Sequence, residues 1–450
     1  MKLDLFYITF DGVDSFYCGV GALTQYFLFD APVLQCSLRD TGTQVKIHIL
    51  YTRVPPEASF FSPDIAQRSR NLALAAGITL HELDPIVATD NPFGTIESWP
   101  YVCERAISLI NDLAEPESFV LALPNDTPFA GMLPMFSAVR APRKSVVWLV
   151  QSTAKLWSDP VLLPLDEERV RWEQTGMDAA TQTPQISLGA TSRYIKEHLA
   201  TDWGVEDDVI VPYHAGIAPG YLHRYYPESG LESLGIRDAV RHSNGRPLLL
   251  SFGRAAWYKG LDTACAVARE VAERSDLYPI VCAADYGTPD SSRAIAALRR
   301  EFHLPIERGC LLTDFDFDLP KYLMQHGDLR VVLVPSKREN LSAIPSEARI
   351  LSRGNAVVVA SAVGGLSEQF DSGVDGFLFN PDDPQSAVDV CLDLATANQR
   401  RLSAIATSGR ERVIRDYRLG NNLTQSVRAT LCSSDDVPHM TRKRLSATTP

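Results

Sequence analysis

The sequence lacks the features that mark several classes of protein. Its 450 residues contain 43 lysines and arginines against 55 aspartates and glutamates, a formal net charge of −12. A nucleic-acid-binding protein needs a basic surface to attract phosphates, so this charge argues against that role. No apolar run approaches the roughly 18 residues that a membrane-spanning helix requires. The first residues, 1–5, lack the charged-then-apolar pattern of a signal peptide.

Cysteines are few and scattered, and none of the eight forms a Cys-x-x-Cys pair. This spacing disfavours both a zinc site and a disulfide framework. We therefore expect reduced thiols and a cytoplasmic location. The cysteines are Cys18, Cys36, Cys103, Cys265, Cys282, Cys310, Cys391 and Cys432.

Strand and helix patterns alternate along the first half of the chain, which is typical of α/β domains with a parallel, doubly wound sheet. The first strand is predicted at 3–10, and Gly19 and Gly21 then precede a helical stretch. This glycine loop is weak evidence for a nucleotide site, because a dinucleotide fingerprint has a third glycine and a tight turn explains the pair equally well. Further strands are predicted at 45–51, 118–123, 145–150, 186–190 and 208–211.

Polar residues follow two of these strands. Asp126 stands just beyond the strand that ends at residue 123, and Gln151 directly follows the strand that ends at residue 150. Open α/β sheets bind ligands at the carboxyl ends of their strands. Both residues are therefore candidate ligand contacts, with ordinary caps and turns as the alternative.

A stretch with proline and glycine, 212–230, contains His214 and separates this pattern from a second one. Because 450 residues exceed one ordinary core, we predict two similar α/β lobes with a cleft between them. Strands of the second lobe are predicted at 248–250, 279–284, 330–334 and 356–360. The predicted parts are a first lobe at 1–218, a second lobe at 219–404, a helix near 405–432 that packs back on the first lobe, and a disordered tail at 433–450.

Two cations stand beside a turn that opens a helix in the second lobe. They belong to the pairs Gly253-Arg254 and Lys259-Gly260. N–H groups at a helix start and fixed cations together suit an anion, above all a diphosphate. A solvated surface pair is the alternative.

Two carboxylates, Glu339 and Glu347, follow the buried strand at 330–334. A carboxylate accepts charge-assisted hydrogen bonds from neighbouring sugar hydroxyls. Cations for phosphate and carboxylates for polyols together describe a nucleotide-sugar pocket. Taken alone, the two glutamates could form a salt-bridged structural pair.

Together these motifs resemble the donor half of family-4 retaining glycosyltransferases, which have the two-lobed GT-B fold. They occur in the order of that family and cover 248–381. The first lobe resembles the family less, through Gly19, Gly21 and the inter-lobe segment 213–217. The motifs are Gly253-Arg254, Lys259-Gly260, Pro335-Ser336, Glu339 with Glu347, Val363-Gly364-Gly365 and Gly373-Val374-Asp375-Gly376.

The resemblance implies a role for each matching residue. Arg254 and Lys259 would bind the diphosphate and stabilise charge on the leaving group, so that no metal is needed. Glu347 would bind the ribose hydroxyls, and Glu339 the transferred sugar. Acceptor attack from the front face would retain the anomeric configuration, and the leaving phosphate would take the acceptor proton. Backbone contacts to the donor would come from Gly21, Gly253, Asn340, Leu341, Ser342, Gly364 and Gly365.

The chain departs from the family at two places. Asn340-Leu341-Ser342 replaces a glycine–aromatic–glycine run, which leaves the donor sugar open. Gln151 stands where many relatives have a histidine near the reacting sugar, and glutamine cannot shuttle a proton. His214 is the nearest histidine in a plausible cleft segment, and a structural role is its alternative.

Asp314 to Asp318 alternates aspartate with phenylalanine. Its Asp-x-Asp spacing is used for metal and nucleotide in another glycosyltransferase fold. We interpret it instead as a loop that leads into a helix at Lys321.

Several alternatives stay open. The acceptor is expected to be a small soluble compound with a hydroxyl group, bound in part by Gly19, Asp126, Gln151 and His214. Acidic loop residues of the first lobe would suit a cationic acceptor such as an amino-sugar or aminocyclitol. A nucleotide-sugar epimerase on the same fold and a catalytically silent sugar-nucleotide-binding protein are the other functions. The sequence does not indicate the nucleotide base or the oligomeric state. The acidic loop residues are Asp11, Asp14 and Asp126.

Replacing Glu347 by alanine is expected to weaken nucleotide binding by about 1.5–3 kcal/mol, the scale of lost charge-assisted hydrogen bonds. Titration calorimetry of the variant and the wild type measures this difference. An unchanged nucleotide affinity would contradict the assignment of Glu347.

Overall fold

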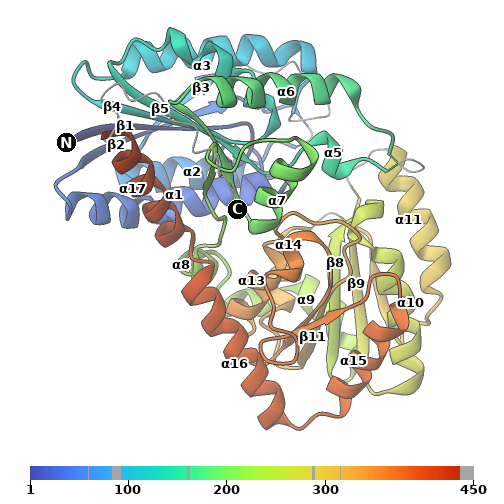
Figure 1. Cartoon of the computed structure of the whole chain (residues 1–450). Coiled ribbons are helices and arrows are strands. Elements are labelled where there is room, and N and C mark those ends of the chain that lie inside the picture. Colours follow the sequence, from blue (N-terminus) through green and yellow to red (C-terminus); the bar gives the residue numbers. More distant parts are fainter. Residues whose placement is uncertain (59, 84–92, 160–162, 286–288, 315, 436–450) are drawn as a thin grey trace, which may run out of the picture.

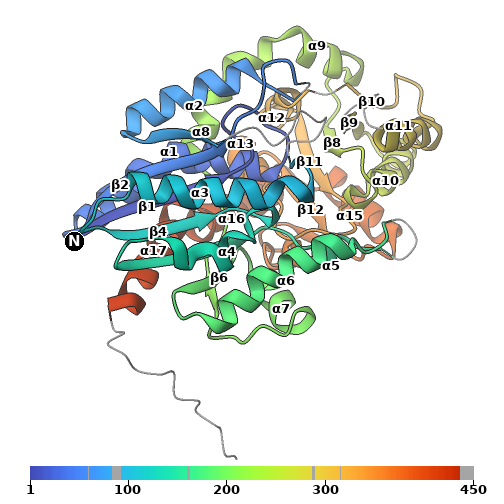
Figure 2. The same ribbon diagram turned by 90° about the horizontal axis from the view of Figure 1, so that it is seen from above.

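The two predicted lobes are present in the computed structural model, which describes residues 1–58, 60–83, 93–159, 163–285, 289–314 and 316–435. Each lobe is a parallel β-sheet covered by helices on both faces (Figures 1 and 2), and the two lobes meet along one side (Figure 1). Three separate clusters of buried apolar side chains form the interior. One of them contains side chains from both lobes, so the lobes pack against each other.

The first lobe contains a seven-stranded sheet with the strand order β3-β2-β1-β4-β5-β6-β7. Its central strands are buried on both faces, which is why they read as almost continuous apolar runs. The strands are β1 (Lys2–Thr9), β2 (Gln44–Thr52), β3 (Thr79–Leu83), β4 (Phe119–Pro124), β5 (Arg143–Val150), β6 (Ile186–Ala190) and β7 (Ile210–Pro212). The helices are α1 (Gly19–Arg39), α2 (Pro63–Ala76), α3 (Trp99–Leu113), α4 (Met132–Met135), α5 (Ala154–Trp157), α6 (Glu167–Gln182) and α7 (Arg193–Asp202).

The second lobe contains a six-stranded sheet with the strand order β10-β9-β8-β11-β12-β13. The strands are β8 (Leu248–Arg254), β9 (Tyr278–Ala284), β10 (Cys310–Leu312), β11 (Leu329–Val334), β12 (Val357–Ser361) and β13 (Phe377–Phe379). The helices are α8 (Pro219–Tyr225), α9 (Leu234–Val240), α10 (Leu261–Arg274), α11 (Pro289–Phe302), α12 (Asp318–Leu323), α13 (Ile344–Leu351), α14 (Gly364–Ser367), α15 (Pro384–Thr396) and α16 (Gln399–Asp416). Short 3₁₀ turns lie at Ile96–Ser98, Thr127–Phe129, Phe136–Ala138, Glu228–Glu232, Arg241–Ser243 and Trp257–Lys259.

The chain crosses between the lobes twice, and the two crossings pair with each other. The Ile217 N–H donates to the Tyr417 carbonyl at 2.9 Å, and the Leu419 N–H donates to the Ile217 carbonyl at 3.0 Å. The last helix, α17 (Leu419–Asp435), then lies against α1 of the first lobe (Figure 1). At its start the Gly420 N–H donates to the Asp30 carboxylate at 3.0 Å.

The sequence predicted the central strands within a few residues and missed three. β3, β10 and β13 are edge strands, and β10 and β13 have three residues each. Residues 436–450 of the predicted disordered tail lie outside the described residues, whereas 433–435 continue α17.

No helix in the described ranges is long and apolar enough to cross a membrane. All eight cysteines, each within the described part of the chain, are free thiols.

A buried histidine lies in the sheet of the first lobe, on β2 next to the edge strand β3. His48 on β2 stacks on Phe6 with 4.7 Å between the ring centroids, and its Nδ1 is 3.0 Å from Nε2 of His81. Its side chain is almost wholly buried. Burial, and next the neighbouring His81, lower the pKa of His48 to about 4.

Acid is therefore expected to destabilise the fold through His48. The unfolded chain binds a proton at this histidine below a pH of about 6.5, whereas the folded chain does so only near pH 4, so stability falls as the pH drops through that window. Between pH 7.5 and pH 5, urea unfolding of the wild type should lose on the order of 2 kcal/mol more than a His48→Leu variant. His303→Asn, at an exposed left-handed position that asparagine tolerates, is the matched control. Equal pH slopes in wild type and His48→Leu would contradict this account.

Candidate functional site

A cavity of about 480 Å³ lies between the lobes, where the loops at the carboxyl ends of both sheets face each other. Its first-lobe wall is lined by residues 16–20, 22–23 and 215–217 and by Phe93, Asp126, Gln151, Ser152, Trp157, Leu163, Arg169 and Thr191. Its second-lobe wall is lined by residues 252–254, 258–259, 316–317, 320–321, 339–344 and 346–347 and by Cys282, Ala284, Asp314, Gln369 and Tyr417. The cavity therefore lies where parallel α/β sheets bind their ligands.

The two predicted diphosphate-binding cations line the second-lobe wall. Arg254 ends β8, and Lys259 ends the following 3₁₀ turn, before Gly260 at φ +64°. The Tyr258 ring lies near both charges, 5.6 Å from the Arg254 guanidinium carbon and 5.4 Å from Lys259 Nζ. Such cation–π contacts fix charges at a cavity wall.

The structure pairs Lys259 with Glu339. Lys259 Nζ donates to Glu339 Oε2 at 2.6 Å, and the Ser336 hydroxyl donates to the same oxygen at 3.2 Å. Both charged side chains are largely buried, with exposed fractions of 16% and 8%. A carboxylate offers about four lone-pair sites. Glu339 therefore retains acceptor capacity for a hydroxyl group beside the cation.

Glu347 lies on α13, and each of its two carboxylate oxygens accepts a hydrogen bond. The Tyr26 hydroxyl on α1 donates to Oε1 at 2.5 Å, and Lys321 on α12 donates to Oε2. The carboxylate thereby joins the two lobes. Burial, and next the Glu347 charge, raise the pKa of Tyr26 well above its ordinary value, so the phenol stays protonated and donates.

The glycine turn after β12 supports the cavity wall from behind. Asn340, Leu341 and Ser342 line the cavity, whereas Gly364 and Gly365 do not. The Gly365 N–H donates to the Glu339 carbonyl at 3.1 Å, and a Cβ on Gly365 would lie 1.5 Å from the Asn340 carbonyl oxygen. Only glycine allows this close approach, which fixes the segment that carries Glu339. Gly365 thus packs behind the cavity wall, and neither Gly364 nor Gly365 lines the cavity as a direct donor contact would require.

The glycine loop of the first lobe is organised by Asp11. Its carboxylate accepts hydrogen bonds from the Ser15 hydroxyl and from the N–H groups of Gly12, Tyr17 and Cys18. Gly19 lines the cavity. Gly21 does not, because it packs on Asp11, where a Cβ would lie 2.6 Å from Oδ2.

Of the two remaining first-lobe candidates, Gln151 lines the cavity and His214 does not. Gln151 lines the cavity, donates to Asn125 Oδ1 at 3.0 Å, and accepts a hydrogen bond from Asn340 at its carbonyl. His214 is exposed, lies outside this cavity, and borders a second one of about 30 Å³.

Of the three loop aspartates, Asp126 lines the cavity. Asp11 and Asp14 do not. Asp14 instead faces the Val54 N–H and the Arg70 guanidinium, each at 3.4 Å.

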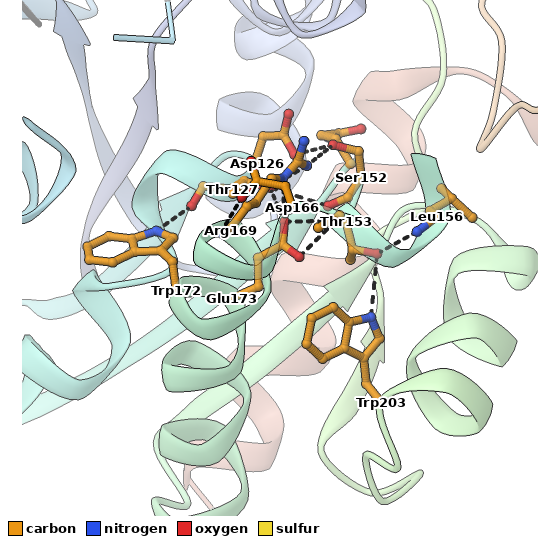
Figure 3. Close-up of polar contacts among 12 residues, drawn as sticks. Asp126, Thr127, Ser152, Thr153, Leu156, Asp166, Arg169, Trp172, Glu173 and Trp203 are labelled. Carbon is orange, nitrogen blue, oxygen red and sulfur yellow. Dashed lines mark hydrogen bonds and ion pairs between the residues drawn. The ribbon is translucent and has the colours of Figure 1, made fainter. Parts of the chain in front are cut away.

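Sequence reasoning missed Arg169, which lines the same wall as Asp126 (Figure 3). It lies on α6 after the cap Asp166 and forms an ion pair with Glu173 at 2.8 Å. In sequence this spacing is that of an ordinary i,i+4 pair on a helix surface. The sequence predicts Lys321 at the start of a helix and Tyr26 within an apolar helix, and neither pattern indicates a place at the cavity.

Asp314 and Asp316 line the cavity at the end near α12. Asp316 Oδ1 accepts hydrogen bonds from the N–H groups of Asp318 and Leu319, at 2.8 and 2.9 Å, so it caps this helix. Among the described residues, no group of three or more histidine, cysteine, aspartate or glutamate side chains is arranged to hold a metal ion.

Parts of the sequence match a family model and curated proteins. Residues 235–412 match the family model of glycosyl transferases group 1. A glycogen synthase of Xanthomonas oryzae pv. oryzae is 29% identical over 176 residues, which are 39% of this chain and 32% of that protein. A D-inositol 3-phosphate glycosyltransferase of Xylanimonas cellulosilytica is 26% identical over 232 residues, 50% of this chain and 52% of that protein. The chain thus matches about a third to a half of the length of these curated relatives.

Solved structures match over almost the whole chain. Sucrose-phosphate synthase of Thermosynechococcus elongatus has a TM-score of 0.66 at 17% identity, and the match covers 96% of this chain and 100% of that one. HepE of Anabaena, solved in complex with UDP, has a TM-score of 0.64 at 15% identity with the same coverage. The chain therefore has the GT-B fold, and its second lobe matches the group 1 glycosyl transferases.

Proposed function

We propose that the protein is a retaining glycosyltransferase that moves a sugar from a nucleotide-diphosphate sugar to a hydroxyl group of a small acceptor. The observation that carries the proposal is the convergence of Arg254, Lys259, Glu339 and Glu347 on one cavity. The cavity size is within the range of small-molecule sites, about 300–1,000 Å³. The two curated relatives described above are named as a glycogen synthase and a glycosyltransferase, which agrees with this reaction class.

Each charged residue has a task in this reaction. Arg254 and Lys259 stabilise the negative charge that develops on the diphosphate as the bond between the sugar C1 and the phosphate oxygen breaks. Glu339, beside Lys259, accepts hydrogen bonds from the transferred sugar. Glu347 accepts hydrogen bonds from the ribose, in addition to those from Tyr26 and Lys321.

The acceptor proton leaves on the departing phosphate. Gln151 stands where a side-chain base would be expected, and an amide cannot accept a proton at neutral pH. In a front-face reaction the acceptor oxygen forms its bond to C1 on the side from which the diphosphate departs. The acceptor hydroxyl is then next to a phosphate oxygen, which takes its proton. The two cations make a divalent metal unnecessary for charge neutralisation.

Removing the Lys259 ammonium should therefore slow the reaction more than it weakens donor binding. We expect Lys259→Ala to lower turnover on the order of 10²-fold, the cost of one donor to a developing negative charge. The assay is nucleoside diphosphate release from UDP-, GDP-, ADP- and dTDP-sugars in the presence of a chelator, with a panel of hydroxyl acceptors. Lys337→Ala is the control, because this ammonium pairs with Asp262 outside the cavity.

The outcomes separate the alternatives. Turnover by the wild type and the Lys337 variant, with a strong loss in the Lys259 variant, supports the proposal. Donor consumption without any dependence on acceptor, and with release of an isomerised sugar, would favour an epimerase. Binding of a nucleotide sugar with no release above background would favour the silent binding protein.

A further inference from the structure

The first-lobe wall of the cavity contains an Asp126–Ser152–Arg169 cluster, whose members are linked by hydrogen bonds (Figure 3). The Ser152 hydroxyl accepts from Arg169 Nη2 at 3.0 Å and donates to Asp126 Oδ1 at 3.1 Å. All three side chains line the cavity. A cation and a carboxylate are thereby held next to each other on the wall that faces Arg254 and Lys259.

The backbone at Asp126 adopts a conformation that is almost restricted to glycine, with φ 71° and ψ 179°. Such a conformation costs about 1–3 kcal/mol and persists only where neighbouring contacts impose it. Here the Asp126 N–H donates to the Leu149 carbonyl, and its own carbonyl accepts from Trp148 Nε1, both at 2.9 Å. Strain of this kind accumulates at functional sites, which makes Asp126 a candidate for ligand contact.

Arg169 has unused hydrogen-bonding capacity. Its Nε donates to Glu173 at 2.8 Å, and its Nη2 donates to Thr127 Oγ1 at 2.9 Å as well as to Ser152. A guanidinium has five N–H groups. Within the described residues the two N–H groups of Nη1 make no hydrogen bond, and 24% of the side chain is exposed.

The charge of Arg169 is already compensated. Glu173 is fully buried against it and also accepts from the Thr127 hydroxyl and the Ala154 N–H. Asp126 is a second carboxylate beside the same cation. Burial raises the pKa of both carboxyls, and Arg169 opposes that rise.

Within the described part of the chain, the first-lobe wall holds no second cation for an anionic ligand. Among the described first-lobe residues, Arg169 is the one basic side chain that lines the cavity. In the second lobe Lys321 is paired with Glu347, and the proposed function assigns Arg254 and Lys259, which line the cavity, to the diphosphate. The internal segments that the structure does not describe contain no lysine or arginine in the sequence; they are 59, 84–92, 160–162, 286–288 and 315.

We infer, resting on the proposed function, that the acceptor is a polyhydroxylated compound without phosphate or carboxylate, bound through neighbouring hydroxyl groups by Asp126 and Arg169. A hydroxyl group both donates and accepts, so one hydroxyl donates to the Asp126 carboxylate while its neighbour accepts from Arg169 Nη1. A phosphate accepts only, and it would meet the negative charge of Asp126 and Glu173. Sugars, cyclitols and their amino derivatives fit this wall, whereas their phosphates do not.

Matched acceptor pairs test this inference, with the donor that the wild type consumes. The pairs are glucose and glucose 6-phosphate, fructose and fructose 6-phosphate, and myo-inositol and myo-inositol 1-phosphate, with glucosamine as a cationic member. We expect kcat/KM for the unphosphorylated member of a reactive pair to exceed that for its phosphate at least tenfold. Preferred use of the phosphates would overturn the inference and leave the proposed function intact. If no nucleotide sugar is bound or consumed, the proposed function itself fails.

Two variants connect the preference to the cluster. Asp126→Asn keeps the size and shape of the side chain and removes its negative charge. This variant should lower the ratio of kcat/KM for the unphosphorylated acceptor to kcat/KM for its phosphate about tenfold. Arg169→Gln should raise the acceptor KM at least tenfold, and Arg171→Gln, an exposed arginine on the same helix outside the cavity, should behave as wild type. Unchanged discrimination in Asp126→Asn, measured on protein with wild-type unfolding temperature, would contradict the inference, as would an unchanged acceptor KM in Arg169→Gln.

Discussion

Paired charges within the cavity wall organise the site. Lys259 pairs with Glu339, Lys321 with Glu347 and Arg169 with Glu173, and all three carboxylates are at least 90% buried. A buried charge without a partner is strongly destabilising, so each residue of a pair fixes its partner. The pairs thereby place cations and carboxylates at the wall without any need for rearrangement. A ligand then adds hydrogen bonds to the unused lone pairs and N–H groups.

One of these carboxylates, Glu347, also connects the lobes, together with other polar and charged residues. Tyr26 of the first lobe donates to Glu347, Asn340 of the second lobe donates to the Gln151 carbonyl, and Arg193 pairs with Glu368 at 3.0 Å. Two aromatic pairs add contacts between the lobes, Trp157 with Tyr258 and Phe16 with Phe317. Because several of these residues line the cavity, a ligand that binds Glu347 or Asn340 also acts on the contacts between the lobes. Lobe closure in such folds excludes water from the reaction.

How much could be predicted from the sequence depended on how local the signal was. Buried central strands such as β11 are continuous apolar runs, and the spacing of Glu339 and Glu347 marked the segment that follows. The edge strand β3 was missed, because its residues are polar and partly exposed. Arg169 was missed as well, since its partners Thr127 and Ser152 lie 42 and 17 residues away and meet it only in the folded sheet. For Gly365, the sequence showed a glycine turn, but the structure was needed to show that the turn packs on the Asn340 carbonyl.

The central claim is that the cavity binds a nucleotide-diphosphate sugar without metal. Thermal unfolding in the presence of UDP-, GDP-, ADP- and dTDP-sugars, each with magnesium and with a chelator, tests it most directly. A ligand at 100 times its Kd stabilises the folded protein by about 2.7 kcal/mol. The account predicts a rise in Tm with the sugars of one nucleotide, equal in magnesium and in chelator. No rise with any of them, or a rise that requires magnesium, would contradict it.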